Sequence, residues 1–351
     1  MNDRARRWRC GRARPSQRTI TAVIAFAWLI GATPAAAQTS PSAASPLAIE
    51  IRAEPITGFD LRDPSRRQFG LLEFRGGLLL RSPARNFGGL SAIRVAADGA
   101  HFIALTDKGW WFRGRLLYAG SRPSGIADAA PILGADGRPL AARGWYDTEA
   151  IAEDGGTLYV GIERVHQIVR FNYGKEGLLA RGQAIASPPG LRSLPANKGI
   201  EALVFVPKGL PLAGTLIAIS ERGLDKAGNI GAFLIGGPTP GAFAIKRSAS
   251  YDITDAALLP GGNILLLERR FGWAIGLAVR LRRISLGDIK PGALADGAVL
   301  FEADLGYEID NMEGLSVHRA AGGEIVLTLV SDDNFSPLQR TLLLQFALAE
   351  P

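Results

Sequence analysis

A short phrase recurs five times along this chain, and every copy ends at an acidic residue. Each copy opens at a polar or acidic residue before small apolar residues, and it closes an apolar run with a charged pair. The openings lie 58, 52, 54 and 58 residues apart, at Ser91, Glu149, Glu201, Asp255 and Glu313. The closing pairs are Asp107-Lys108, Glu163-Arg164, Glu221-Arg222, Glu268-Arg269 and Asp332-Asp333. A strand-built repeat of this length indicates a propeller, whose blades surround a central channel.

The pattern between the repeated phrases is also that of strands. Short apolar runs such as 101–105 and 167–171 are bounded by turn residues, and no long segment shows a capped helical period. We therefore expect an all-β fold, a β-propeller of five or six blades. Six blades are weakly preferred because residues 46–85 hold further strands, although these strands could instead close the last blade. A two-sheet sandwich or a large barrel is the structural alternative.

The first residues of the chain have the pattern of a targeting segment. Seven Arg residues precede an apolar run over 20–32, and small residues follow up to Ala37. This predicts a signal peptide over 1–37 and a periplasmic or secreted protein, with an uncleaved anchor as the alternative. Residues 38–46 are rich in Ser, Pro and Ala, which predicts a flexible lead-in. Residues 47–351 are then expected to form a single β-propeller domain.

The charge of the predicted mature chain argues against one class of partner. The whole chain carries 40 Lys and Arg against 33 Asp and Glu, but the leader holds seven of the basic residues and one acid. The remaining 33 basic and 32 acidic residues nearly cancel, so we expect no nucleic-acid partner. The one cysteine, Cys10, lies in the leader, which excludes thiolate chemistry and disulfides from the mature chain. We expect a monomer without a stable membrane span after cleavage.

Radial repetition would bring the repeated acids to one end of the channel. Carboxylates this close raise one another's pKa or require cations. Their Arg and Lys neighbours could neutralise them as a structural ion-pair ring, and this alternative stays open. Otherwise their oxygen atoms suit Ca²⁺, and the candidate ligands are Glu149, Glu163, Glu201, Glu221, Asp255, Glu268, Glu313 and Asp332. The basic residues that would then bind an anionic substrate such as a phosphate are Lys108, Arg164, Arg222 and Arg269.

Motifs of other reaction classes are missing from the sequence. It contains no G-x-S-x-G, H-E-x-x-H, P-loop or dinucleotide-binding motif. Of the three histidines, His166 follows Glu163 closely enough to reach the same rim, and it is a minor candidate. The sequence therefore identifies no catalytic nucleophile or base.

The repeated phrases resemble those of the phytase-like family, which is described as having esterase-like activity. The resemblance rests on Gly89-Leu90-Ser91-Ala92-Ile93, Asp147-Thr148-Glu149-Ala150-Ile151, Gly199-Ile200-Glu201-Ala202-Leu203, Asp310 to Ser316 and Ser331 to Phe335. It covers most of the chain from about residue 57 to 347. It implies a propeller related to the alkaline phytases, which bind calcium and hydrolyse phosphate esters. The acids to test are then Glu149, Glu201, Glu221, Glu268 and Glu313. Four of the five closing acids have a basic residue next to them, and in this respect the chain differs from the dense calcium site of the alkaline phytases.

Two functions follow as hypotheses. The first is an exported, Ca²⁺-assisted phosphoesterase or ester hydrolase with a small anionic or ester substrate. The second is a non-catalytic propeller that uses the same rim to bind a ligand or a protein.

Overall fold

The computed structural model of the protein describes residues 46–119, 122–123, 129–272 and 276–349. The predicted signal peptide and all but the last residue of the predicted lead-in lie outside these ranges, so both stay predictions. Strands dominate the described chain, and its two α-helices are single turns, α1 (Tyr173–Glu176) and α2 (Pro189–Arg192). Among the described residues, no helix has the length and apolar character needed to cross a bilayer.

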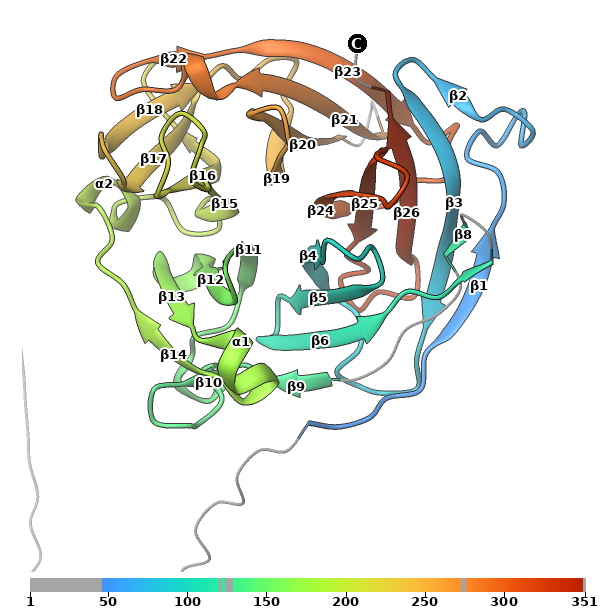
Figure 1. The fold of residues 1–351 in the computed structure, drawn as a ribbon, viewed down its shortest axis with the longest axis horizontal. Coiled ribbons are helices and arrows are strands. Elements are labelled where there is room, and N and C mark those ends of the chain that lie inside the picture. The colour runs from blue at the N-terminus through green and yellow to red at the C-terminus, as the bar shows by residue number, and fades with distance from the viewer. Residues whose placement is uncertain (1–45, 120–121, 124–128, 273–275, 350–351) are drawn as a thin grey trace, which may run out of the picture. The chain divides into compact units, whose positions relative to one another are not determined.

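Five mainly antiparallel sheets form the blades of a propeller (Figure 1), and the outermost strand pairs of blades 2 and 3 are parallel. Their inner strands contact one another around the centre, and they are β4 (Leu90–Val95), β11 (Thr148–Asp154), β15 (Ile200–Phe205), β19 (Asp252–Leu258) and β24 (Met312–Arg319). From the inside outward, blade 1 continues with β5 (His101–Thr106), β6 (Trp110–Arg115) and β9 (Ala129–Pro131). Blade 2 continues with β12 (Thr157–Ile162), β13 (Gln167–Phe171), β14 (Arg181–Ala184) and β10 (Leu133–Gly134).

The other three blades are built in the same way. Blade 3 continues with β16 (Thr215–Leu224), β17 (Ile230–Gly236), β18 (Gly241–Ile245) and β22 (Leu294–Ala295). Blade 4 continues with β20 (Asn263–Gly272), β21 (Gly276–Ser285) and β23 (Gly297–Asp304). Blade 5 continues with β25 (Ile325–Ser331), β26 (Thr341–Leu348), β3 (Leu72–Arg81) and β1 (Arg52–Ile56), and β2 (Gln68–Phe69) also pairs with β3. A separate two-stranded sheet joins β7 (Tyr118–Ala119) and β8 (Arg122–Pro123).

Blade 5 closes the ring with strands from both ends of the described chain. Strand β3 runs antiparallel to β26, with Gly77 opposite Leu344 and Leu80 opposite Thr341. The all-β propeller is thus confirmed with five blades, and the preference for six is wrong. The N-terminal strands make no blade of their own because they form the outer edge of blade 5, where their backbone groups pair with the C-terminal strand.

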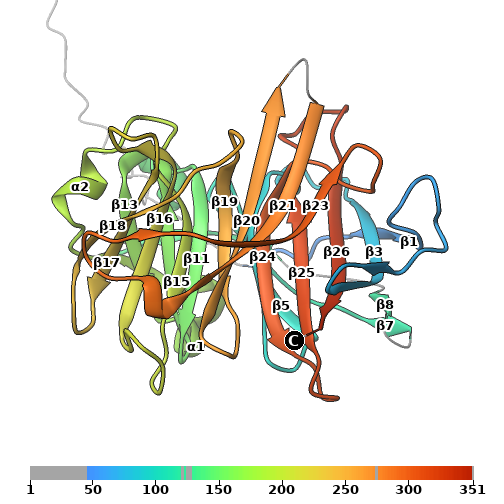
Figure 2. The same ribbon diagram turned by 90° about the horizontal axis from the view of Figure 1, so that it is seen from above.

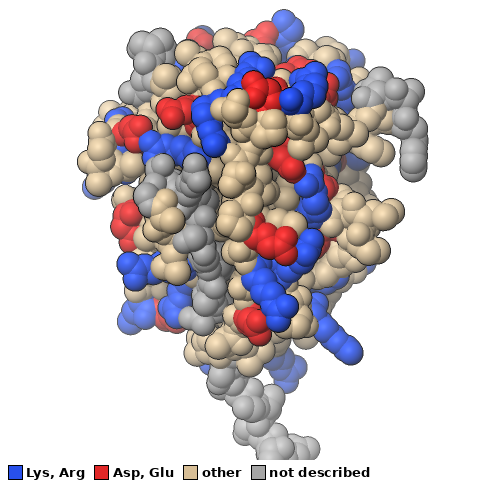
Figure 3. Space-filling view, turned by 90° about the vertical axis from the view of Figure 1, so that its right-hand side faces the viewer, with Lys and Arg blue, Asp and Glu red and all other residues tan. Residues whose placement is uncertain are grey.

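The apolar faces of neighbouring blades form the core. Between blades 1 and 2, for example, Trp111 is fully buried against Phe171, with ring centroids 5.0 Å apart. Its indole N–H donates to the carbonyl of Leu178 at 3.0 Å, so the polar atom of the ring is satisfied. Outside the core, acidic and basic side chains are interspersed over the side of the molecule that Figure 3 shows.

Every blade has a β-bulge between its inner strand and the next strand. One extra residue interrupts the register of the inner strand, and these five bulge positions are Ser91, Glu149, Glu201, Thr254 and Glu313. A bulge bends its strand and re-aims the side chain. The repeat found in the sequence is therefore a repeat of bulges, and its member in blade 4 is Thr254, one residue before the predicted Asp255.

Candidate functional site

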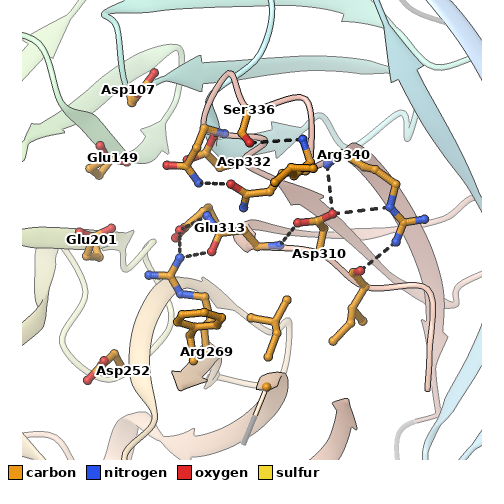
Figure 4. A pocket seen from close by; sticks show the side chains of 18 of the residues that line it. Asp107, Glu149, Glu201, Asp252, Arg269, Asp310, Glu313, Asp332, Ser336 and Arg340 are labelled. Carbon is orange, nitrogen blue, oxygen red and sulfur yellow. Dashed lines mark hydrogen bonds and ion pairs between the residues drawn. The ribbon is translucent and has the colours of Figure 1, made fainter. Parts of the chain in front are cut away.

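A cavity of about 1040 Å³ opens at one end of the channel, on the side of the bulges. The loops and strand ends of all five blades line it, and its titratable lining residues are Asp107, Asp147, Glu149, Glu201, Arg222, Asp252, Arg269, Asp310, Glu313, Asp332 and Arg340. In Figure 4, Asp107, Glu149, Glu201 and Asp252 follow one side of this cavity, and Glu313, Asp310 and Arg340 lie across from them. The tandem blades therefore bring many of the predicted acids to one mouth.

Three of the five bulge positions are occupied by a glutamate that lines this cavity, and the other two are occupied by a hydroxyl residue. The Ser91 hydroxyl donates to the carbonyl of Thr148 at 2.6 Å, and the Thr254 hydroxyl donates to the carbonyl of Met312 at 3.0 Å. Both hydroxyls thus fasten a blade to the next one around the ring. The other three bulge residues, Glu149, Glu201 and Glu313, line the cavity.

A second set of equivalent residues lies where the second strand of each blade ends. In four blades this residue is acidic, and its backbone N–H donates to the carbonyl of the residue two positions before the bulge, at 2.8 to 3.0 Å. We call these four the closing residues, and they are Asp107, Glu163, Glu221 and Asp332. In blade 4 the corresponding pair is Asp252 and Arg269. Arg269 therefore occupies the position at which the other four blades have a carboxylate.

This register corrects the predicted place of Glu268. Adjacent residues of a strand point to opposite faces, so Glu268, one residue before the closing position, points away from the ring. Its side chain is fully buried between Arg280 and Arg282, and Arg282 Nη2 lies 2.7 Å from its Oε1. Glu268 is a structural ion-pair residue of blade 4 and does not line the cavity.

Asp255 is also placed away from the cavity lining. It follows the bulge in β19, and its fully buried carboxylate is held by both terminal nitrogens of Arg94, at 2.9 and 3.1 Å. The backbone N–H of Leu315 donates to the same carboxylate at 2.8 Å. The Arg94 guanidinium also donates to the carbonyls of Leu203, Ala256 and Leu315, so it joins three other blades across the channel. The pair is a cross-link of the ring, and neither oxygen of Asp255 is left for a metal.

The carboxylates at the mouth differ in how they are compensated. No hydrogen bond or ion pair to another described residue engages Glu149 or Glu201, and Glu201 is only 8 % exposed. Burial, reinforced by the surrounding carboxylates, raises the pKa of both well above the usual value. Burial also raises the pKa of Asp107 to about 6 and those of Glu313 and Asp332 to about 7. Arg269 opposes the rise at Glu313.

The four predicted anion-binding residues divide into two pairs. Arg222 and Arg269 line the cavity, where Arg222 is hydrogen-bonded to Asp252, and Arg269 to Glu313 and Asn311. Lys108 and Arg164 are exposed and lie over aromatic rings, those of Phe335 and Tyr146. Neither Lys108 nor Arg164 lines the cavity. The structure therefore brings two of the four bases to the site, and both are already paired with acids.

One group of carboxylates fits a hard cation. Glu163, Glu201 and Glu221, from blades 2 and 3, each offer an oxygen atom, and the three atoms lie within 4.8 Å of one another. Glu163 accepts a hydrogen bond from the Gly199 N–H at 2.7 Å, and Glu221 lies 3.3 Å from Lys198 Nζ and 3.5 Å from Arg269 Nη2. All three are at most 9 % exposed. An all-oxygen donor set with an unpartnered, buried member suits Ca²⁺.

The cavity also has members that the sequence reasoning did not select as site residues. Asp147, Asp252 and Asn311 all stand two residues before a bulge position, at the mouth. Asp107 leaves one buried oxygen without a hydrogen bond in the described chain. An alignment of the five repeats on their bulges, in place of their acids, would have grouped Asp147, Asp252 and Asn311, whereas Asp107 was already grouped as a closing acid. The apolar lining at 277, 305, 309 and 338 has no repeated signal that could have been found.

The family and the fold were compared with known proteins. A family model described as "Phytase-like: Esterase-like activity of phytase" matches residues 85–335. No curated protein matches the chain. Among solved structures, a chain of the nidogen/laminin complex is 10 % identical, with 82 % of this chain and 88 % of that chain covered and a TM-score of 0.38. The PQQ-bound aldose sugar dehydrogenase from Streptomyces coelicolor is 14 % identical, with 78 % and 98 % covered and a TM-score of 0.38.

Proposed function

Because this chain belongs to the phytase-like family, we propose that the channel mouth is the active site of a Ca²⁺-assisted phosphoester hydrolase. The observation that supports this most is the buried carboxylate of Glu201. It faces the cavity without a partner in the described chain, and Glu163 and Glu221 each bring an oxygen within 4.8 Å of it. An ionised group in this position is unfavourable unless a cation compensates it.

Glu163, Glu201 and Glu221 would hold the ion, with Glu149 as an additional acid beside Glu201. When bound, Ca²⁺ would supply Lewis-acid stabilisation of negative charge on the ester oxygens. Arg269 and Arg222 would orient the substrate phosphate at the cavity wall. Glu313 has a pKa of about 7 in the metal-free protein, so it can exchange a proton near neutral pH, as general acid or base catalysis requires.

The experiment is hydrolysis of p-nitrophenyl phosphate by the purified mature protein, with Ca²⁺ or with excess EGTA. We expect Ca²⁺-dependent turnover that Glu201→Gln abolishes. Glu153→Gln is the matched control, because Glu153 lies on the same strand β11 as Glu149 but outside this cavity. Activity that is absent with Ca²⁺, or unchanged by EGTA, would rule out the proposed hydrolase.

A non-catalytic binding propeller is the second candidate, and the pairing of the cavity's bases favours it. Arg222 and Arg269 are each held by carboxylates, so no lining Arg among these two is free to stabilise a transition state. This function predicts that a ligand raises the melting temperature without being turned over, since a ligand that binds only the folded state stabilises it.

We also propose that the protein is exported as a monomer to the periplasm or the medium, and that its substrate is a small molecule. The basis is the Arg-rich start and short apolar run of the chain, together with the near-neutral balance that follows them. Cell fractionation with N-terminal sequencing tests cleavage near Ala37, and light scattering tests the monomer.

A further inference from the structure

The two sides of the cavity differ in chemistry. The lining from blades 1 to 3 is made of charged residues alone, namely Asp107, Asp147, Glu149, Glu201 and Arg222. The lining from blades 4 and 5 combines four further acids and two arginines with apolar side chains. This second side includes Leu277 at the start of β21, Leu305 and Ile309 in the β23–β24 connection, and Leu338 in the β25–β26 connection. We call these four residues the apolar wall. Figure 2 shows the β20–β21 hairpin of blade 4 extending beyond the neighbouring strands.

Two of the four side chains of the apolar wall are left exposed by the fold. Leu338 is 91 % exposed and Leu305 is 59 % exposed, although both line the cavity. Exposed leucines are ordinary when they are scattered singly over a surface. Here both line one cavity that is large enough for a ligand, and the lining from blades 1 to 3 is entirely charged. An occupant that matches both sides must have a polar end and an apolar end.

The charge of the lining disfavours a densely anionic occupant. Eight acidic residues line the cavity against three arginines, Arg222, Arg269 and Arg340. Arg340 is no freer than the other two, because it lies 2.7 Å from Glu308 and 3.5 Å from Asp310. A ligand with several phosphates would bring further negative charge against these acids, and one bound divalent cation cannot compensate it. A single phosphate that binds together with the cation adds little net charge to the cavity, because the charge of the cation offsets that of the phosphate.

We propose that the substrate class is an alkyl or aryl phosphomonoester. Its single phosphate binds at the acidic side through the cation, and its apolar group lies on Leu305, Leu338 and their neighbours. This inference rests on the proposed function, because it takes the same cavity and the same cation. It also predicts that an inositol polyphosphate, which carries several phosphates, is a poor ligand.

The test measures binding without turnover, by calorimetry in saturating Ca²⁺, with methyl-, butyl- and octylphosphonate as probes. We expect affinity to rise with chain length, by up to about fourfold for each methylene that is fully buried. Inositol trisphosphate is expected to bind no more tightly than methylphosphonate. Equal affinity for all three phosphonates, or no detectable binding of any of them, overturns the inference. Tighter binding of inositol trisphosphate than of octylphosphonate overturns it as well.

Substitutions at two exposed leucines test whether the dependence of affinity on chain length arises at the apolar wall. Leu305→Ser and Leu338→Ser should each reduce the dependence on chain length, while affinity for methylphosphonate and for Ca²⁺ stays the same. Leu294→Ser on β22 is the matched control, because Leu294 is 54 % exposed but lies outside the cavity. An unchanged chain-length dependence in both wall variants contradicts the assignment.

A titration with Ca²⁺ alone, read together with the turnover assay and the phosphonate series, separates this inference from the proposed function. Calcium binding and turnover without any chain-length dependence would leave the hydrolase and remove the inference. Chain-length-dependent binding without turnover would keep the alkyl phosphate as the ligand class but remove the hydrolase, in favour of the non-catalytic propeller.

Discussion

Arg269 of blade 4 donates a hydrogen bond to Glu313 of blade 5, and so places a guanidinium inside a ring of carboxylates. The register shows why, since Arg269 stands where the other blades have Asp107, Glu163, Glu221 or Asp332. The ion-pair ring and the proposed cation site, which the sequence offered as alternatives, meet at Glu221, which lies 3.5 Å from Arg269 and 3.3 Å from Lys198. Arg269 neutralises the side next to Glu313, whereas Glu163 and Glu201 form no ion pair with another described residue; with Glu221 they are the group that we propose for an added cation.

Replacement of Arg269 by Gln should destabilise the metal-free protein. Glu313 is buried and would lose its main compensating charge, and breaking such a pair typically costs about 3 kcal/mol. Chemical denaturation at neutral pH with EGTA measures the loss. The loss should shrink at about pH 5, where Glu313, with its pKa of about 7, is protonated. Arg52→Gln, which removes an exposed pair, is the control. An equal loss of stability in this control would show that the pairing of Arg269 with Glu313 does not stabilise the protein.

Replacement of Glu201 by Gln should have opposite effects with and without metal. Without metal, it removes a buried carboxylate that has no partner in the described chain, so the melting temperature should rise at neutral pH. With metal, the loss of one oxygen ligand should weaken Ca²⁺ binding by ~10-fold or more. Thermal melts and calcium titrations of Glu201→Gln and of the control Glu153→Gln check both. A lower melting temperature in EGTA would contradict the assignment.

The stability of the metal-free protein should fall as pH rises from about 5 to about 7.5. Unfolded carboxyl groups titrate at about 4, whereas burial raises the pKa to about 6 for Asp107 and about 7 for Glu313 and Asp332. Between these values the folded state holds more protons than the unfolded state, so raising the pH favours unfolding. Denaturation midpoints measured in EGTA across this range test the sign. Saturating Ca²⁺ should weaken the trend or reverse it, because the cation binds the ionised carboxylates.

Replacement of Arg94 by Met should destabilise the propeller without affecting the cavity. The change leaves Asp255 fully buried and uncompensated and removes hydrogen bonds to three other blades, for a loss of about 3–5 kcal/mol. The double variant Arg94→Met/Asp255→Leu should lose less than the two single variants together. Denaturation curves measure these losses, and Ca²⁺ affinity should match the unmodified protein. A change in Ca²⁺ affinity would place Asp255 within the metal site after all.

The sequence by itself determined the fold class and much of the site. Apolar runs bounded by turns predicted strands, and the spacing of the repeats predicted blades, because a repeated strand unit buries its faces against its neighbours. Glu149, Glu201 and Glu313 were predicted for the right place because each bulge re-aims its residue toward the same mouth. The family resemblance likewise followed from these phrases and was confirmed over residues 85–335.

Only the tertiary structure decided the blade number, the register of blade 4 and the apolar wall. The pairing of β3 with β26 depends on contacts between distant ends of the chain, which no local pattern encodes. In blade 4, the predicted acids Asp255 and Glu268 lie one residue from the ring positions Thr254 and Arg269. Because side chains of a strand alternate between faces, that single residue turns both acids away from the cavity and toward arginine side chains.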